Sequence, residues 1–369
     1  MGIYFKIIVL ISLLLLSFSG CSKKEDDTIK IGFIAGLSGK YSSLGTSIRD
    51  GFILAFDQID YKIDGKKVKI IQKDDKQDSK VAKKVLEELL NSGVKLIVGN
   101  ATSAMTSVSF PIINKQKDFV MISATASAAK FTAKDDNFLR IQVEHNEKRY
   151  TALKQYIQHH KFNNIFMVYD SKNMEYAKGY LGFFQNMIIE SGGNGFIGKA
   201  DLNDPYESIM KKIKNKDIDL ILIVGNSIDS ATFIQYLRLH NVQTKILCSG
   251  WAKTVDFIKN GGGAVEGVLF ASGYDENSKD PKFQNFVKLY KKKYHKEPSV
   301  FAAQGYELGQ ILIQNLKNST DISTLKDRIL EIKNYEGLQG GIKFDKYGDV
   351  SREYFMMEVK NHQYQKIEP

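Results

Sequence analysis

Residues 93–127 read GVKLIVGNATSAMTSVSFPIINKQKDFVMISATAS, and this stretch decides the fold class. Two apolar runs, 96–99 and 119–123, have the length of buried strands, and a helix is predicted to begin after Ser103. A strand, a helix and a second strand in this order predict a β-α-β unit with parallel strands. Helices must cover both faces of such a sheet, which agrees with strands that are apolar throughout.

The same alternation extends along the chain in two series. The first series adds predicted strands at 29–37 and 68–72 and helices at 48–59 and 81–90. The second has predicted strands at 164–170, 196–200, 220–225, 245–248 and 267–271, and helices at 176–191, 206–213 and 230–240. These strands are too many for one ordinary doubly wound sheet, so the sequence predicts an α/β fold of two similar lobes with parallel sheets. Helices at 281–294, 300–317 and 325–333 and a β pattern at 341–344 and 354–359 complete the chain.

Composition excludes several classes of protein. With 43% hydrophobic and 25% charged residues among 369, the chain is globular rather than disordered. The net charge of +10 suggests an anionic partner, but only 6 of the 52 basic residues are Arg, the usual reader of phosphates and bases. The short Lys runs, such as 291–293, fall on helix faces or turns. They indicate a solvated surface, and we expect no nucleic-acid partner.

The N-terminus predicts a secretory signal. Residues 1–20 contain one charge, Lys6, followed by an apolar run that is too short to span a bilayer. Small residues precede Cys21, as in a bacterial lipobox, whose cysteine is acylated and becomes the new N-terminus. We expect a polar tether at 21–27 and a membrane anchor through Cys21; a plain signal peptide with an incidental cysteine is the alternative. Cys248 is then a free thiol.

Signatures of catalysis and metal binding are missing from the sequence. Residues 193–198 match G-x-G-x-x-G, but they follow a predicted helix and precede a strand, which is the reverse of a dinucleotide turn. The pair Asp74–Asp75 ends a strand, where neighbouring side chains point to opposite faces. Neither G-x-S-x-G nor a metal-ligand spacing occurs. We therefore expect no enzyme activity, no cofactor and no metal.

Two strand ends carry small hydroxyl residues. The strand 96–99 runs into Asn-Ala-Thr-Ser103, and the strand 119–123 runs into Ala-Thr-Ala-Ser127. Hydroxyls beside free N–H groups at a helix start suit a carboxylate or another polar group. Helix capping explains one such segment equally well, but two at the same sheet edge favour a binding site.

The chain resembles the type I periplasmic substrate-binding proteins of ABC importers, in the leucine/isoleucine/valine-binding subgroup. The resemblance is carried, in family order, by 29–39, Gly45, Gly51, Asp74, Asp75, Asp78, Ala82, 93–99, 121–126, Tyr169, Asp170, 266–268 and 344–349. It implies two Rossmann-like lobes joined by a three-segment hinge and closing on a small ligand. Mapped onto this sequence, lobe I is 28–142 plus 274–338, and lobe II is 143–273 plus 339–369.

The resemblance also implies ligand-binding residues. Ser103 and Ser127 match the residues that hold a ligand carboxylate, Thr125 offers a backbone contact, and Tyr176 matches a tyrosine that closes over the ligand. Asn226 stands where amino-acid binders place an aromatic residue. Gly250 stands where they place an acid for the ligand ammonium, and Trp251 follows it. A buried ammonium without a counter-charge is costly, which predicts an organic acid, aromatic acid or amide stacked on Trp251 or Tyr176. Two alternatives stay open, namely that a cation–π contact holds an ammonium and that Trp251 belongs to the core.

These observations predict a monomeric solute-binding lipoprotein of the periplasm or cell surface, which captures a small polar ligand and delivers it to an ABC permease. The alternative is a binding protein of the same fold that signals through a membrane receptor or kinase.

Overall fold

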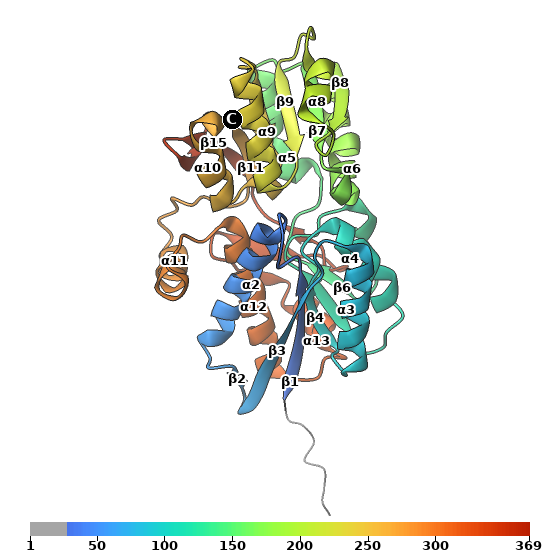
Figure 1. Ribbon diagram of the computed structural model, residues 1–369. Helices are drawn as coiled ribbons and strands as arrows, with labels where there is room; N and C mark the ends of the chain where they lie inside the picture. Colours follow the sequence, from blue (N-terminus) through green and yellow to red (C-terminus); the bar gives the residue numbers. More distant parts are fainter. Residues whose placement is uncertain (1–27) are drawn as a thin grey trace, which may run out of the picture.

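The computed structural model describes residues 28–369, which form two α/β lobes stacked one above the other (Figure 1). The predicted signal peptide, Cys21 and tether lie outside the described residues. Each lobe is built around its own sheet, and this confirms the two-lobe α/β prediction.

The lobe I sheet has six strands. Their order is β2 (Lys62–Ile63), β3 (Lys66–Asp74), β1 (Ile29–Ala35), β4 (Leu96–Gly99), β5 (Val120–Ser123) and β6 (Phe138–Arg140). All pairings are parallel except that of β2 with β3. Side chains of β1 alternate between two cores, because successive strand residues point to opposite faces. Phe33 packs on the side of α2 (Ser42–Asp57) and α12 (Val300–Asn318), and Ile34 packs on the side of α3 (Ser79–Asn91) and α4 (Ser103–Ile113).

Two glycines bring α2 and α12 into backbone contact. A Cβ added at Gly51 would lie 1.8 Å from the carbonyl oxygen of Ala302, and one added at Gly305 would lie 2.1 Å from that of Ile48. No side chain fits at either position. The C-terminal part of the chain therefore returns to lobe I against the first helix. The further helices of lobe I are α11 (Pro281–Tyr294) and α13 (Leu325–Ile332).

The lobe II sheet has seven strands. Their order is β16 (Gln363–Ile367), β15 (Phe355–Lys360), β11 (Leu269–Ser272), β10 (Lys245–Cys248), β9 (Leu220–Val224), β7 (Asn164–Tyr169) and β8 (Gly195–Asp201). The five strands from β11 to β8 pair in parallel, whereas β15 and β16 are antiparallel additions. Lobe II contains the helices α5 (Glu147–His159), α6 (Met174–Gly179), α7 (Gln185–Glu190), α8 (Tyr206–Ile213), α9 (Ser227–Leu239) and α10 (Val255–Gly261). The helix predicted over 176–191 is divided by a π-helical turn at Tyr180–Phe184.

Three segments join the lobes, and a small third sheet lies beside them. That sheet consists of β12 (Asn334–Glu336), β13 (Gly341–Phe344) and β14 (Val350–Ser351). It is bound to lobe I, for example by an ion pair of 2.6 Å between Arg140 Nε and Asp349 Oδ1. The connections between the two large sheets therefore run through 141–146, 273–280 and 352–354. From these contacts we infer a final lobe boundary at 352–354, whereas the resemblance implies one at 338.

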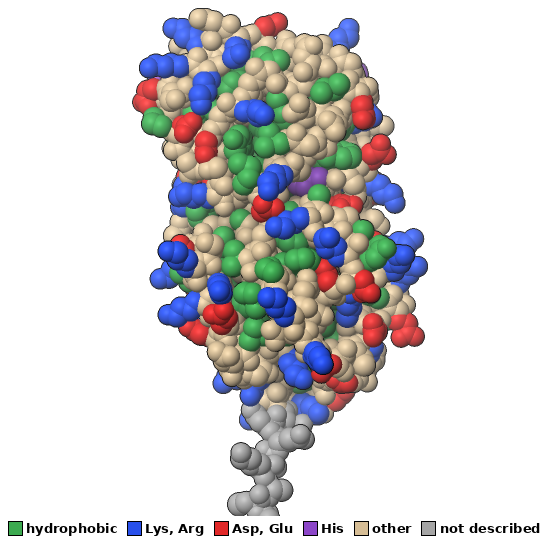
Figure 2. All heavy atoms as spheres, turned by 90° about the vertical axis from the view of Figure 1, so that its right-hand side faces the viewer, with side chains coloured by type: hydrophobic (Ala, Val, Ile, Leu, Met, Phe, Trp, Pro, Cys, Tyr) green, Lys and Arg blue, Asp and Glu red, His purple; other side chains and the backbone are tan. Residues whose placement is uncertain are grey.

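Basic side chains are spread over the molecular surface. In the face shown in Figure 2, Lys and Arg side chains lie on both lobes and alternate with Asp and Glu. Many lysines are ion-paired, as Lys73 is with Glu88 (2.6 Å) and Lys291 with Glu297 (2.6 Å). Within residues 28–369, no helix is long and apolar enough to cross a membrane.

Candidate functional site

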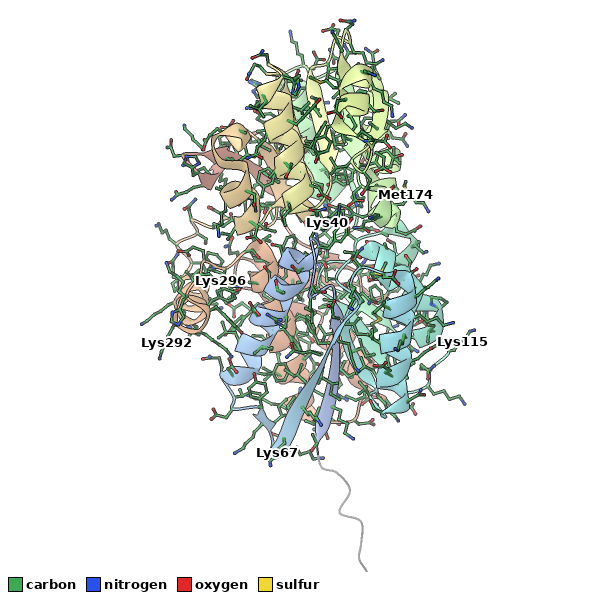
Figure 3. All side chains as sticks on the ribbon, viewed as in Figure 1. Lys40, Lys67, Lys115, Met174, Lys292 and Lys296 are labelled. Carbon is green, nitrogen blue, oxygen red and sulfur yellow. The ribbon has the colours of Figure 1, made fainter. Side chains whose placement is uncertain are left out.

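The cleft between the lobes is closed by hydrogen bonds that join one lobe to the other. They run from Lys40 Nζ to Asp229 Oδ2 (2.6 Å), from Tyr41 OH to Asp170 Oδ2 (3.1 Å), from Ser43 Oγ to Asp256 Oδ2 (2.5 Å) and from Ala104 N to Asn173 Oδ1 (3.1 Å). Lys40 lies at the junction of the lobes (Figure 3). The residues involved follow the carboxyl ends of strands in both sheets, which is where ligands bind in open α/β folds.

Ser103 and Ser127 meet at the lobe I side of this cleft. Ser103 begins α4, and its Oγ accepts hydrogen bonds from the backbone N–H groups of Ser127 (3.1 Å) and Ala128 (3.2 Å). With both acceptor sites occupied, the Ser103 hydroxyl has its hydrogen left to donate. The Oγ of Ser127 is buried and has no partner among the described residues. The structure thus brings together two hydroxyls that suit an incoming acceptor such as a carboxylate.

Thr125 lies in the same loop, but its polar groups have internal partners. Its hydroxyl donates to the carbonyl oxygen of Ala101, and its N–H donates to Ser123 Oγ at 3.3 Å. This loop conformation turns the chain so that Ser127 faces Ser103. These bonds indicate a positioning role for the Thr125 hydroxyl, and the backbone contact expected from the sequence stays a prediction.

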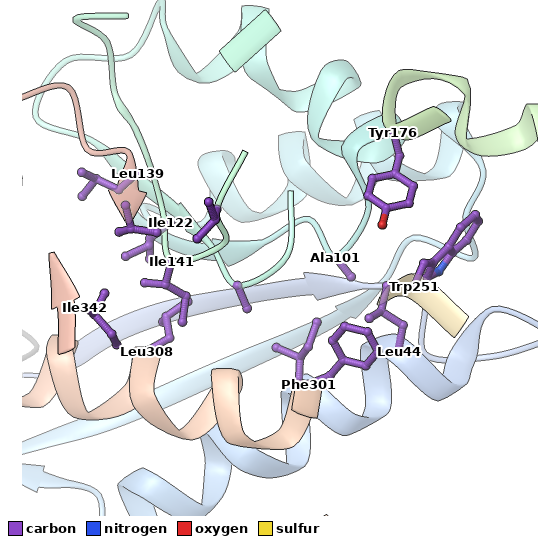
Figure 4. Close-up of a cluster of buried hydrophobic side chains, with 14 of the residues drawn as sticks. Leu44, Ala101, Ile122, Leu139, Ile141, Tyr176, Trp251, Phe301, Leu308 and Ile342 are labelled. Atoms are coloured by element: carbon purple, nitrogen blue, oxygen red, sulfur yellow. The ribbon is translucent and has the colours of Figure 1, made fainter. Parts of the chain in front are cut away.

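Tyr176 and Trp251 form an aromatic pair in lobe II that faces lobe I. Their ring centroids lie 6.1 Å apart in an edge-to-face arrangement, and Trp251 stacks on Tyr41 of lobe I at 6.0 Å. Trp251 is 6% exposed and shares an apolar cluster with Leu44, Ala101 and Phe301. Figure 4 shows Tyr176, Trp251 and Leu44 around the end of a lobe I strand. Trp251 is therefore buried in the contact between the lobes.

Asn226 is a helix cap. Its Oδ1 accepts the N–H groups of Ile228 and Asp229 at 3.0 Å each, and its Nδ2 donates to Asp229 Oδ2. These bonds place Asp229 where it receives Lys40 from lobe I. Asn226 thus positions Asp229 for its ion pair with Lys40 across the cleft. The family pattern alone does not predict this contact.

A small cavity that is partly open to solvent lies at the hinge end of the cleft, and the sequence does not predict it. Its volume is about 30 Å³, and it is lined by Gln142, Arg149, Gly250, Lys253, Ala271, Ser272, Gly273, Tyr274, Val300, Phe301, Gln304 and Tyr354. All three connecting segments contribute to this lining, through Gln142, Tyr274 and Tyr354. Because these residues come from distant parts of the chain, no local spacing marks them.

Burial shifts the pKa values of two ionisable groups in and beside the cleft, Tyr41 and Asp75. Burial, and then the nearby carboxylate of Asp170, raises the pKa of the Tyr41 hydroxyl, which therefore remains a donor. Burial raises the pKa of Asp75, while the hydrogen bond from Asn100 opposes this shift. Within residues 28–369 the structure contains no group of three or more His, Cys, Asp or Glu arranged to hold a metal ion.

Known proteins that are similar to this chain match it over most of its length. A family model described as "Periplasmic binding protein" matches residues 28–363. The Leu/Ile/Val-binding protein of Escherichia coli (strain K12) is 24% identical over 342 residues, which are 91% of this chain and 91% of that protein. The structure of a leucine binding protein, LivK, from Thermotoga maritima has a TM-score of 0.83 at 22% identity, covering 92% of this chain and 97% of that one. A solute binding protein of an ABC transporter from R. palustris, in complex with benzoate, has a TM-score of 0.83 at 18% identity, covering 92% and 96%.

Proposed function

The chain belongs to the periplasmic binding protein family, and from this premise we propose that it is an extracytoplasmic solute-binding protein of an ABC transporter. In this proposal the protein captures a small polar ligand between its lobes and delivers it to a membrane permease. The relatives are named as binding proteins, which supports capture without catalysis.

The observation that carries the proposal is the closed cleft itself. Lobe I offers the hydroxyls of Ser103 and Ser127, and lobe II offers the Tyr176–Trp251 pair. A ligand that contacts both sides binds the closed arrangement better than an open one, and so it shifts the equilibrium toward closure. Closure is the signal that a permease can recognise.

The ligand that we propose is an organic acid, aromatic acid or amide rather than a branched-chain amino acid. Gly250 supplies no carboxylate for an α-ammonium, and the nearest charged side chain of the following turn is a lysine, Lys253. Lys253 is buried and is itself paired with Glu276. Micromolar binding of leucine to the purified protein would contradict this assignment.

Thermal-shift screening of amino acids, organic acids and amides, followed by calorimetry, tests the site. The double variant Ser103→Ala/Ser127→Ala should lose about 100-fold in affinity, from two hydrogen bonds to a charged group at about 1.5 kcal/mol each. Ser107→Ala is the matched control, because that hydroxyl lies on the same helix and donates to Ser103 O within it. Unchanged affinity of the double variant would remove Ser103 and Ser127 from the site.

The membrane anchor is a separate part of the proposal. Support comes from the order of Lys6, an apolar run, small residues and Cys21. Cells supplied with labelled palmitate should incorporate label into the wild-type protein and not into Cys21→Ser. Labelling of the variant at the wild-type level would rule out acylation at Cys21.

A further inference from the structure

Arg149 is buried at the hinge end of the cleft without a carboxylate partner. It is 3% exposed and lies in the first turn of α5, where its Nη1 donates to the carbonyl oxygen of Val143 at 2.8 Å. Its guanidinium lies over the rings of Tyr354 (5.4 Å) and Tyr150 (5.7 Å). Its Nε and Nη2 form no further hydrogen bond with residues 28–369, but neither is among the fully buried atoms that lack a partner, so they keep some contact with solvent.

The other buried arginines of the protein are paired differently. Arg140 forms an ion pair with Asp349 at 2.6 Å, and Arg352 forms one with Glu307 at 2.7 Å. A guanidinium remains charged at any ordinary pH. A buried charge is costly to leave without a counter-charge. The described residues give Arg149 a carbonyl oxygen and two aromatic rings but no carboxylate, so an anion that enters here meets an unpaired positive charge.

The charges around the cavity leave a net positive site. Lys253 lines the cavity, but its ammonium is paired with Glu276 and lies over the ring of Tyr364. Glu307, which contacts the cavity residue Tyr274, receives Arg352 on both of its oxygens. Arg149 is thus the one uncompensated charge of this lining in the described part of the chain.

The cavity also contains an unpaired acceptor, which needs a donor and does not itself attract an anion. Gln304 is 3% exposed, and its Oε1 is buried without a partner, although its Nε2 donates to Gln142 Oε1 at 2.7 Å. The cavity volume of about 30 Å³ is about one water molecule's share of liquid volume. Its place in the structure is also informative, because Gly250 and Phe301 connect this lining to Trp251 and to the aromatic contact between the lobes.

We propose that Arg149 binds an acidic group of the ligand, so that the cleft selects a solute whose hinge-facing end is a carboxylate. This inference rests on the proposed solute-binding function and narrows its ligand. An amino-acid binder of the family pattern would need a negative side chain where this chain has Gly250. Here the same region carries a buried positive charge, so an ammonium is repelled and a carboxylate is attracted.

Matched ligand pairs test this inference on the wild-type protein. Calorimetry compares benzoate with benzamide, succinate with succinamide, and leucine with leucinamide. At least one acid should bind about 30-fold or more tightly than its amide, which is the loss expected when one partner of a buried charge pair is removed. If no acid binds more tightly than its amide, the anion site is overturned and solute capture is left standing. Failure of every acid, amide and amino acid to bind would contradict both proposals.

Arg149→Gln tests the residue. It should weaken binding of the preferred acid by about 30-fold or more and leave binding of the amide unchanged. Arg238→Gln is the matched control, because Arg238 also lies in a lobe II helix and donates its Nη1 to backbone carbonyls, of Val242 (2.6 Å) and Thr244 (3.2 Å). Acid affinity that survives in Arg149→Gln would overturn the proposal. If this variant does not fold, Arg149→Met, which keeps an unbranched side chain and removes the charge, takes its place in the same comparison.

Discussion

Two of the four hydrogen bonds that join the lobes come from the hydroxyls of Tyr41 and Ser43, and removing both should shift the cleft toward an open arrangement. In the double variant Tyr41→Phe/Ser43→Ala, the carboxylates of Asp170 and Asp256 each lose a hydroxyl donor, originally at 3.1 and 2.5 Å. The ring at position 41 stays in place against Trp251, so the aromatic contact between the lobes is kept. The variant therefore isolates the contribution of these two hydroxyls, while the bonds from Lys40 to Asp229 and from Ala104 to Asn173 remain.

The magnitude follows from the kind of bond that is lost. A hydrogen bond to a charged group contributes about 1.5–3 kcal/mol, and part exposure of both donors places these two at or below the lower end. A combined loss of about 2–3 kcal/mol changes the ratio of closed to open molecules by about 30- to 150-fold. The loss affects an equilibrium between two folded arrangements, so the folded cores of the two lobes should keep their own stability.

Trp251 provides the assay, because it is the only tryptophan of the chain and lies in the contact between the lobes. Without added ligand, the double variant should show red-shifted emission and stronger quenching by acrylamide than the wild type. Lys245→Met is the control, since it removes an ion pair of 2.7 Å between Lys245 and Glu358 inside lobe II. Emission of the double variant that superimposes on that of the wild type would refute the reasoning.

Two further predictions concern stability. Gly51→Ala should lower the free energy of unfolding in urea by at least about 2 kcal/mol, because its Cβ would meet Ala302 O across the α2–α12 contact. Gly182→Ala is the control and should have little effect, because position 182 faces open space. Equal effects of the two substitutions would contradict the close-contact argument. Burial, and then the charges of Arg149 and Arg140, hold the pKa of His145 well below its usual value. Below about pH 6.5 the folded state therefore binds fewer protons than the unfolded state, and the stability of the protein falls as the pH drops. The difference in unfolding free energy between wild type and His145→Gln should shrink by up to about 1.4 kcal/mol per pH unit below that point, and a difference that is constant from pH 7.5 to 5 would contradict this account.

Most of the fold could be predicted because parallel β-α-β units leave a strong local signal. Strands buried on both faces are continuously apolar, as in the run 96–99, and amphipathic helices separate them. The small sheet β12–β14 could not be assigned to a lobe in this way. Its attachment to lobe I depends on contacts such as Arg140 with Asp349, which are more than two hundred residues apart in the sequence.

The candidate site was partly predictable for the same reason. Ser103 and Ser127 follow neighbouring strands, so their meeting is a consequence of sheet order. Asn226 also follows a strand, but a side chain at that position can cap its helix or face the cleft, and the sequence does not distinguish these roles. Arg149 lies in a polar helix start, where a solvated side chain is the ordinary interpretation. Its burial depends on Tyr354 and on the hinge segment that contains Val143.

The position of Arg149 connects ligand charge to lobe closure. The lining of its cavity includes Gln142, Tyr274 and Tyr354, one from each segment that joins the lobes. Any rotation of one lobe against the other changes the torsion angles of these segments and therefore the shape of the cavity. The cavity lining includes residues of both lobes, such as Gly250 and Phe301, so an anion paired with Arg149 should stabilise the closed arrangement over an open one. Ser103 and Ser127 lie on one lobe and can hold a ligand in either arrangement, whereas the hinge-end cavity distinguishes the two. We therefore propose that Ser103 and Ser127 bind the ligand in both arrangements of the lobes. Arg149 then stabilises the closed arrangement once the ligand is enclosed.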